Sequence, residues 1–149
     1  MIAPWKNDLQ SRLDQIRAST DSDFAGLAME EQHRRRIRWV AASGNGNDRY
    51  AELAVRSGRG VTGLAIKLGR PVVADAAMPA SERERLLPDD SIMAVERLQA
   101  AIVVPLAIQD EIRGVLLVGS RSQRIYEEGC LQLAIEAADR LAPRLRQLL

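Results

Sequence analysis

The sequence predicts an α+β fold, with one central, mainly antiparallel sheet of five to six strands and helices packed on it. Three patterns support this prediction. Amphipathic helical spacing occurs at both ends of the chain, two long apolar runs follow one another around residue 110, and a glycine-rich segment separates short stretches in the middle. With 149 residues, 46 % of them hydrophobic, the chain is long enough to bury a core.

Both ends of the chain are predicted to be helices. At the N-terminal end, Pro4 can occupy a first helical turn, and Leu9, Leu13 and Ile16 recur at helical spacing up to residue 19. Near the C-terminus, one apolar stripe steps by three or four residues, with a proline at position 143 close to its end. The members of that stripe are Leu131, Ile135, Ala138, Leu141, Leu145 and Leu148.

The strands are predicted from period-two patterns and β-branched runs. Residues 24–29 and 35–42 form the first two strands, joined by a polar turn. Alternation along the second strand predicts that Ile37, Trp39 and Ala41 share the inward face. Residues 100–108 and 112–119 are the strongest strands and form an antiparallel hairpin around residues 109–111.

Between these strands the chain is predicted to be less regular. Residues 49–55 are assigned to a short helix or turn, residues 61–68 to a helix and residues 72–74 to a strand. Residues 76–97 are the least regular stretch and are assigned to a long loop. Its acidic residues, with two neighbouring arginines, predict a solvated surface rather than a metal or catalytic pair; they are Glu82, Glu84, Asp89 and Asp90.

Composition excludes several classes of function. A net charge of +1 argues against dominant electrostatic binding to nucleic acid or to an anionic membrane. One cysteine, Cys130, and one histidine, His33, exclude an intrachain disulfide framework and a Cys/His zinc site, and no other metal site is predicted. No apolar run approaches about 20 residues, so no membrane span is predicted. This composition fits a reducing cytosol, and a cytoplasmic protein is expected.

The glycine segment at residues 57–75 is the most informative part of the chain. A tight turn at Gly58 and Gly60 opens into a short helix, and Gly69 closes that helix before the next strand. A helix start of this kind leaves several backbone N–H groups without internal partners, and these groups can hold a small negative charge. The segment is therefore predicted to meet a ligand.

The motif Gly58-x-Gly-x-x-Gly63, followed by Gly69-x-Pro71-Val-Val-x-Asp75, resembles the central signature of GAF domains. Residues 96–106 and 112–118 resemble the two strands after the variable loop of that family. The resemblance implies one GAF domain over residues 1–149, with an N-terminal helix at 1–19, the sheet and ligand pocket at 20–124, and a C-terminal helix at 125–149. It also implies both terminal helices on one face, with short helices and a variable loop covering the pocket on the other.

Residues 38–50 and 56–66 resemble the stand-alone GAF proteins of the NreA nitrate-receptor type. In those proteins nitrate lies beneath a helix start, held by main-chain N–H groups beside a tryptophan. By position, the resemblance assigns Trp39, the amides of Val61 and Thr62, and a further amide from Ser91 or Ile92. An apolar lining is expected from Ile37, Leu64, Ile92 and Val103, and it would favour a weakly hydrated anion.

Tyr50, with Asn45 and Asp48, flanks this segment and either covers the mouth of the pocket or belongs to an ordinary loop. The resemblance implies no cofactor and no enzyme activity. It implies a sensor that binds nitrate and signals to a partner such as a two-component sensor histidine kinase. The apolar stripe of the terminal helices offers a further surface, including a possible homodimer contact.

Other interpretations stay open. The domain can bind a different small ligand, such as a carboxylate, or be an interaction protein with an empty pocket. The glycines can serve only to form a tight turn, and Trp39 can be an ordinary core residue. A dinucleotide site needs a parallel crossover that the predicted hairpin does not provide. The family's free-methionine-sulfoxide reductases need several cysteines, and Cys130 is interpreted as a packing residue.

Overall fold

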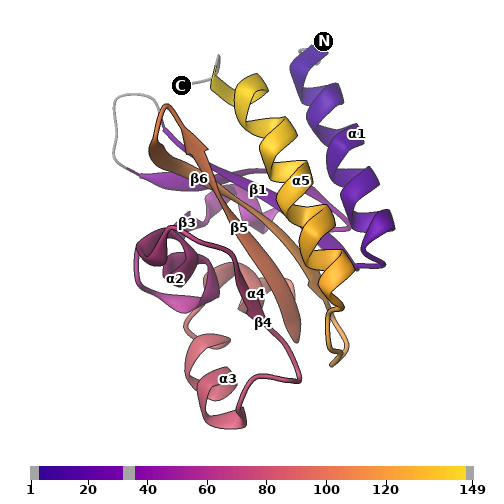
Figure 1. Cartoon of the computed structure of the whole chain (residues 1–149), viewed down its shortest axis with the longest axis vertical. Coiled ribbons are helices and arrows are strands. Elements are labelled where there is room, and N and C mark those ends of the chain that lie inside the picture. The colour runs from indigo at the N-terminus through magenta and orange to yellow at the C-terminus, as the bar shows by residue number, and fades with distance from the viewer. Residues whose placement is uncertain (1–3, 32–35, 147–149) are drawn as a thin grey trace.

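The computed structural model describes residues 4–31 and 36–146. Its elements form one sheet with helices on both faces, which confirms the predicted α+β class (Figure 1). In chain order they are α1 (Pro4–Ser19), β1 (Phe24–Glu30), β2 (Ile37–Ser43), the 3-10 helix η1 (Arg49–Glu52), β3 (Ala54–Val55), α2 (Gly60–Leu68), β4 (Val72–Ala74), α3 (Ala80–Leu86), α4 (Ser91–Val95), β5 (Ala100–Ile108), β6 (Glu111–Ser120) and α5 (Glu128–Leu145).

The sheet has six strands in the order β3-β2-β1-β6-β5-β4, and each neighbouring pair within it is antiparallel. The long β5–β6 hairpin forms its centre together with β1. Gln109 and Asp110 make the turn of that hairpin with φ of 55° and 66°, a left-handed conformation that residues without a branch at Cβ accept better than β-branched ones. The parallel crossover of a dinucleotide-binding unit does not occur in this sheet, so that interpretation of the glycine motif is excluded.

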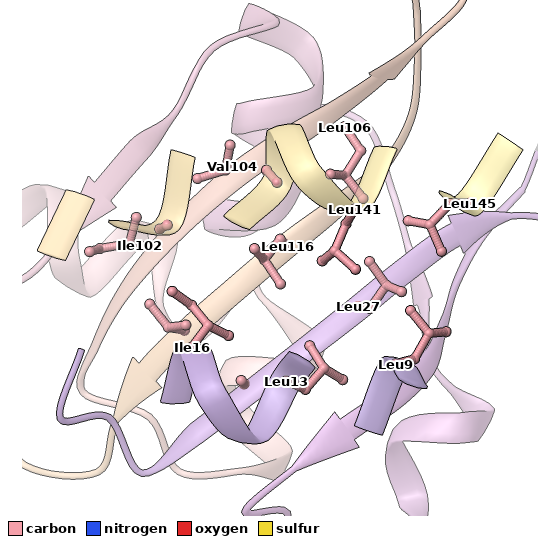
Figure 2. Close-up of a cluster of buried hydrophobic side chains, with 14 of the residues drawn as sticks. Leu9, Leu13, Ile16, Leu27, Ile102, Val104, Leu106, Leu116, Leu141 and Leu145 are labelled. Atoms are coloured by element: carbon pink, nitrogen blue, oxygen red, sulfur yellow. The ribbon is translucent and has the colours of Figure 1, made fainter. Parts of the chain in front are cut away.

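The terminal helices α1 and α5 lie side by side on one face of the sheet (Figure 1). Leu9, Leu13 and Ile16 from α1 meet Leu141 and Leu145 from α5 above the apolar residues of β1, β5 and β6 (Figure 2). The described part of the apolar stripe of α5 therefore packs within the chain. Leu148, the last predicted member of that stripe, lies outside the described residues. Among the helices described, none combines the length and apolar character needed to cross a membrane.

The shorter helices α2 and α4 cover the opposite face. Val61 and Ala65 of α2 and Ile92 and Met93 of α4 pack with Trp39 of β2 and with inward residues of β1, β5 and β6. We call this set the pocket-side core. The short helices thus lie on the face of the sheet where the family resemblance placed them, opposite the terminal helices. The predicted arrangement of helices on the two faces is confirmed.

One strand prediction was wrong. Ile37 and Trp39 face the pocket-side core, but Ala41 packs against the opposite core under α1. The cause is a β-bulge, because Leu27 pairs with Ala41 while Ala28, the next residue, pairs with Trp39. Val40 is the extra residue and is exposed. A bulge reverses the alternation of side chains beyond it, which simple period-two counting does not reveal.

The irregular stretch also differs from the prediction. Residues 76–97 contain the two helices α3 and α4 instead of one long loop, and residues 49–55 contain both η1 and the short edge strand β3. Each of these elements is seven residues or shorter, too short to show a clear sequence period. The predicted polar turn at residues 30–34 lies mostly outside the described part of the chain, which omits residues 32–35.

Candidate functional site

Backbone geometry at the start of α2 explains its glycines. Gly60 has φ of +67°, and a Cβ there would lie 2.5 Å from Cβ of Asp90. Gly63 passes so close to the preceding turn that a Cβ would lie 2.1 Å from the carbonyl oxygen of Arg56. The turn is closed by hydrogen bonds from the Gly58 amide to the Gly63 carbonyl, at 2.8 Å, and from the Gly63 amide to the Arg59 carbonyl, at 3.0 Å. Glycine is thus required at both places.

This turn leaves amide donors at the start of α2. In the described residues, the amides of Gly60 and Val61 have no hydrogen-bond acceptor, and Val61 is fully buried. The first amides of a helix have no partner within the helix, and a buried one normally finds a side chain, a water or a ligand. The Val61 amide, which the sequence assigned to ligand binding, is therefore a free buried donor.

Trp39 supplies a second free donor. Its side chain is 2 % exposed, and its indole Nε1 has no hydrogen-bond partner within the described structure. Trp39, Val61 and Ile92 all belong to the pocket-side core. An unsatisfied buried donor costs about 1–3 kcal/mol. Two such donors in one apolar cluster favour a small acceptor-rich ligand, such as an oxyanion.

The Thr62 amide, in contrast, is already occupied. It donates to Oδ2 of Asp90 at 2.9 Å, and the Thr62 hydroxyl donates to the same oxygen at 2.7 Å. The other carboxylate oxygen, Oδ1, accepts the Met93 amide at 3.2 Å, so that Asp90 is the N-cap of α4. The prediction of a solvated Asp90 was wrong, because this residue is only 2 % exposed. Its carboxylate bridges the starts of α2 and α4.

Burial is the main influence on Asp90. Desolvation of its carboxylate raises the pKa above the ordinary value of 3.8, and hydrogen bonds from Thr62, Met93 and Ile92 oppose that rise. The Asp90 carboxyl group therefore occupies the helix start to which the family resemblance assigns a bound anion.

A cleft of about 340 Å³ opens beside this bridge, between the start of α2, the β3 region and the start of α4. Of the predicted site residues, Thr62 and Ser91 line it, whereas Trp39, Val61, Ile92 and Tyr50 do not. Three arginines and three carboxylates contribute to its wall, which gives no excess of either charge. They are Arg36, Arg56, Arg59, Glu52, Asp89 and Asp90.

The remaining predicted residues are distributed around the pocket-side core. Tyr50, on η1, is half-buried and packs against that core. Ile37, Leu64 and Val103 belong to it or pack on it, as the expected apolar lining would require. Asn45 instead donates to the carbonyl of Asn47 within its own loop, at 2.8 Å.

An ion pair between a buried carboxylate and a partly exposed arginine holds the far end of α4. Arg121, which directly follows β6, donates to the side chain and main-chain carbonyl of Glu96 and to the carbonyl of Gly44. The Glu96 side chain is 1 % exposed and also accepts the Gly46 amide at 2.9 Å. This clasp ties α4 to the loop after β2, so both ends of α4 are held by buried carboxylates.

Sequence reasoning missed Asp90 and the Glu96–Arg121 clasp. Asp90 stands directly before the short run Ser91-Ile-Met93, which is a recognisable N-cap pattern. No comparable signal identifies the clasp, because its partners are 25 residues apart and meet only in the folded chain.

Comparison with known proteins agrees with this architecture. The family profile for the GAF domain matches residues 9–144, and the chain belongs to the GAF domain family. A Staphylococcus aureus NreA protein mutated in its nitrate binding site is 34 % identical, over 82 % of this chain and 89 % of that chain, with a TM-score of 0.67. A second structure of mutated S. aureus NreA is 33 % identical over 85 % and 97 % of the two chains, with a TM-score of 0.69.

A more distant structure shares the fold alone. The type II free methionine-R-sulfoxide reductase of Thermoplasma acidophilum is 19 % identical over 95 % of this chain and 92 % of that chain, with a TM-score of 0.73. A search of curated proteins gave no significant match. A protein with a nitrate binding site and an enzyme therefore both occur on this scaffold, and the residues of the site must distinguish such functions.

Proposed function

We propose that this protein is a receptor for a small inorganic anion, nitrate in particular, and that the anion binds between the start of α2 and Trp39. The observation that carries the proposal is the pair of buried donors without acceptors in the described structure, the Val61 amide and the Trp39 indole N–H. An amide at the start of α4 is proposed to complete the site, either that of Ser91 or that of Ile92, the second of which also hydrogen-bonds the Asp90 carboxylate.

The apolar setting supports a weakly hydrated anion. The apolar side chains of the pocket-side core exclude water from the buried donors, so each hydrogen bond to a bound anion is stronger than in water. The free-energy cost of dehydrating an anion rises with its charge, which favours a singly charged one. Nitrate carries one delocalised charge and three acceptor oxygens. The 34 % identity with an NreA protein that has a nitrate binding site supports the same ligand.

Signalling would require a partner. We propose that anion binding orders the segment of α3 and α4 over the site and that a partner protein, such as a two-component sensor histidine kinase, detects this change. The apolar stripe of the terminal helices packs against the sheet within the chain. A partner or a second copy would therefore contact the side chains that stay exposed on those helices, including Trp5 on α1 and Leu133 on α5.

We also propose that the chain is a receptor and not an enzyme. The related reductases on this scaffold are expected to use several cysteines, whereas this chain has only Cys130. Cys130 lies in the first turn of α5, on the face of the sheet opposite the proposed anion site, where it packs against the core under α1. A redox reaction at the anion site would therefore have no thiol of this chain beside it.

The test is nitrate titration followed by calorimetry and by fluorescence of the Trp5→Phe variant, in which Trp39 is the remaining tryptophan. We expect a saturable change with nitrate and a weaker response to sulfate. Replacing Trp39 by Phe should weaken binding by roughly 10- to 100-fold, the value of one hydrogen bond to a charged group. Absence of binding, or equal affinity in the Trp39→Phe variant, would contradict the proposed site.

A further inference from the structure

Resting on the proposed function, we propose that nitrate binds together with a proton, which is taken up by Asp90. The carboxylate of Asp90 occupies the start of α2 in the free protein and is the group that must lose its charge when an external anion arrives. Asp90 thereby becomes a specificity-determining residue, because it makes anion binding depend on pH and selects against multiply charged anions.

The geometry provides the first argument. Oδ2 of Asp90 accepts both the amide and the hydroxyl of Thr62, and Gly60 leaves room for Asp90 only because it lacks a side chain. The free Val61 amide is one residue before Thr62, so an anion on Val61 would lie close to this carboxylate. Two negative charges at one buried helix start repel each other strongly, because little water is present to screen them.

Neutralisation of Asp90 removes this conflict. An ionised carboxylate only accepts hydrogen bonds, whereas a protonated one also donates through its O–H. Uptake of one proton from solvent thus removes the like charge and adds a donor that can face the anion. Burial, which raises the pKa of Asp90, brings this protonation closer to neutral pH.

Among the residues that the structure describes, the surrounding charges do not provide another neutralising group. The cleft next to Asp90 is lined by Arg36 before β2, Glu52 of η1, Arg56 and Arg59 before α2, and Asp89 before α4. Arg59 forms an ion pair with Asp89 at 3.9 Å, and about half of each of these two side chains is exposed. Exposed arginines interact weakly with a buried carboxylate across water, so Asp90 is left to respond by taking up a proton.

The experiment measures nitrate affinity by calorimetry between about pH 5.5 and 8, each time in two buffers of different ionisation enthalpy, which together count the protons taken up. The key variant is Asp90→Asn, since asparagine is a good N-cap, keeps one of the two acceptor oxygens and, like the protonated acid, carries no charge. Asp89→Asn is the matched control on the exposed neighbour. His33→Gln controls for the one histidine of the sequence, because an imidazole group ordinarily changes its charge within this pH range.

We expect the wild-type dissociation constant to rise by up to about tenfold per pH unit above the pKa of Asp90 in the free protein, with uptake of about one proton per nitrate. Both controls should keep that slope. Asp90→Asn should bind nitrate with an affinity that is independent of pH, and more tightly than the wild type at the alkaline end.

Two results would overturn the coupling. Nitrate binding by the wild type without a pH slope would reject the proton while leaving the receptor function intact. A slope that persists in Asp90→Asn would assign the proton to another group. If neither the wild type nor Asp90→Asn binds nitrate at any pH, the receptor function itself fails, and the coupling fails with it.

Discussion

Two glycines with almost the same backbone conformation allow the packing at the α2 start to be measured. Gly60 has φ of +67° and Gly69 has φ of +68°, so alanine at either position meets the same conformational penalty. Their surroundings differ. A Cβ on Gly60 would lie 2.5 Å from Cβ and 2.7 Å from Cα of Asp90, whereas nothing lies within 4 Å of a Cβ on Gly69.

The expected costs follow from this difference. Gly69→Ala should reduce the free energy of unfolding by about 1–2 kcal/mol, the penalty for a side chain in the left-handed region. Gly60→Ala should pay the same penalty and a further 1–3 kcal/mol or so for overpacking, because the contact involves the backbone of Asp90 and cannot be relieved by a side-chain rotation. The shift should also separate Asp90 from Thr62.

Urea unfolding followed by circular dichroism gives both free energies, and the two variants should have similar slopes with denaturant. Gly58→Ala, with φ of +82° and only Cδ of the Lys67 side chain nearby at 3.6 Å, is a second control and should behave like Gly69→Ala. Equal losses for Gly60→Ala and Gly69→Ala would refute the idea that α2 and the Asp90 cap are in rigid contact.

Three further predictions concern charges and ligand. Arg121→Met leaves the Glu96 carboxylate buried without its cation and should lower the free energy of unfolding by an amount toward the lower end of roughly 3–5 kcal/mol, since 35 % of the Arg121 side chain is exposed. Adding Glu96→Gln to this variant should restore part of that free energy, as measured by urea unfolding. Because the pKa of Asp90 is raised in the folded state, its contribution to stability is complete below about pH 3.8 and is lost as pH rises through the folded-state pKa. The Asp90→Asn variant should therefore gain stability relative to the wild type as pH rises across that window. A difference in unfolding free energy between the two proteins that stays constant with pH would contradict this. Nitrate at 100 times its dissociation constant should raise the free energy of unfolding by about 2.7 kcal/mol, whereas sulfate at equal ionic strength should have a much smaller effect.

Local sequence patterns were sufficient for most of the framework. The helical spacing of Leu9, Leu13 and Ile16, the paired apolar runs of β5 and β6, and Gly69 at the end of α2 each specify local structure directly, and each prediction is confirmed. These signals depend on neighbours within one or two turns of helix or along one strand, so they can be recognised without knowing the fold.

Tertiary structure decided what the sequence pattern left open or misassigned. The bulge at Val40, which turns Ala41 away from Trp39, comes from the pairing of β1 with β2 and has no local signature. The short helix α3 depends on packing, and α4 on packing and on the Asp90 cap, more than on their own periodicity.

The candidate site shows the same division. Residue types and glycine spacing alone pointed to free amides at the start of α2 and to an inward-facing Trp39. Only the folded chain brought Asp90, 28 residues away, onto the Thr62 amide and left the Val61 amide and the Trp39 indole without acceptors. Whether a polar group is buried and satisfied depends on segments far apart in sequence, and for that reason it is a property of the tertiary structure.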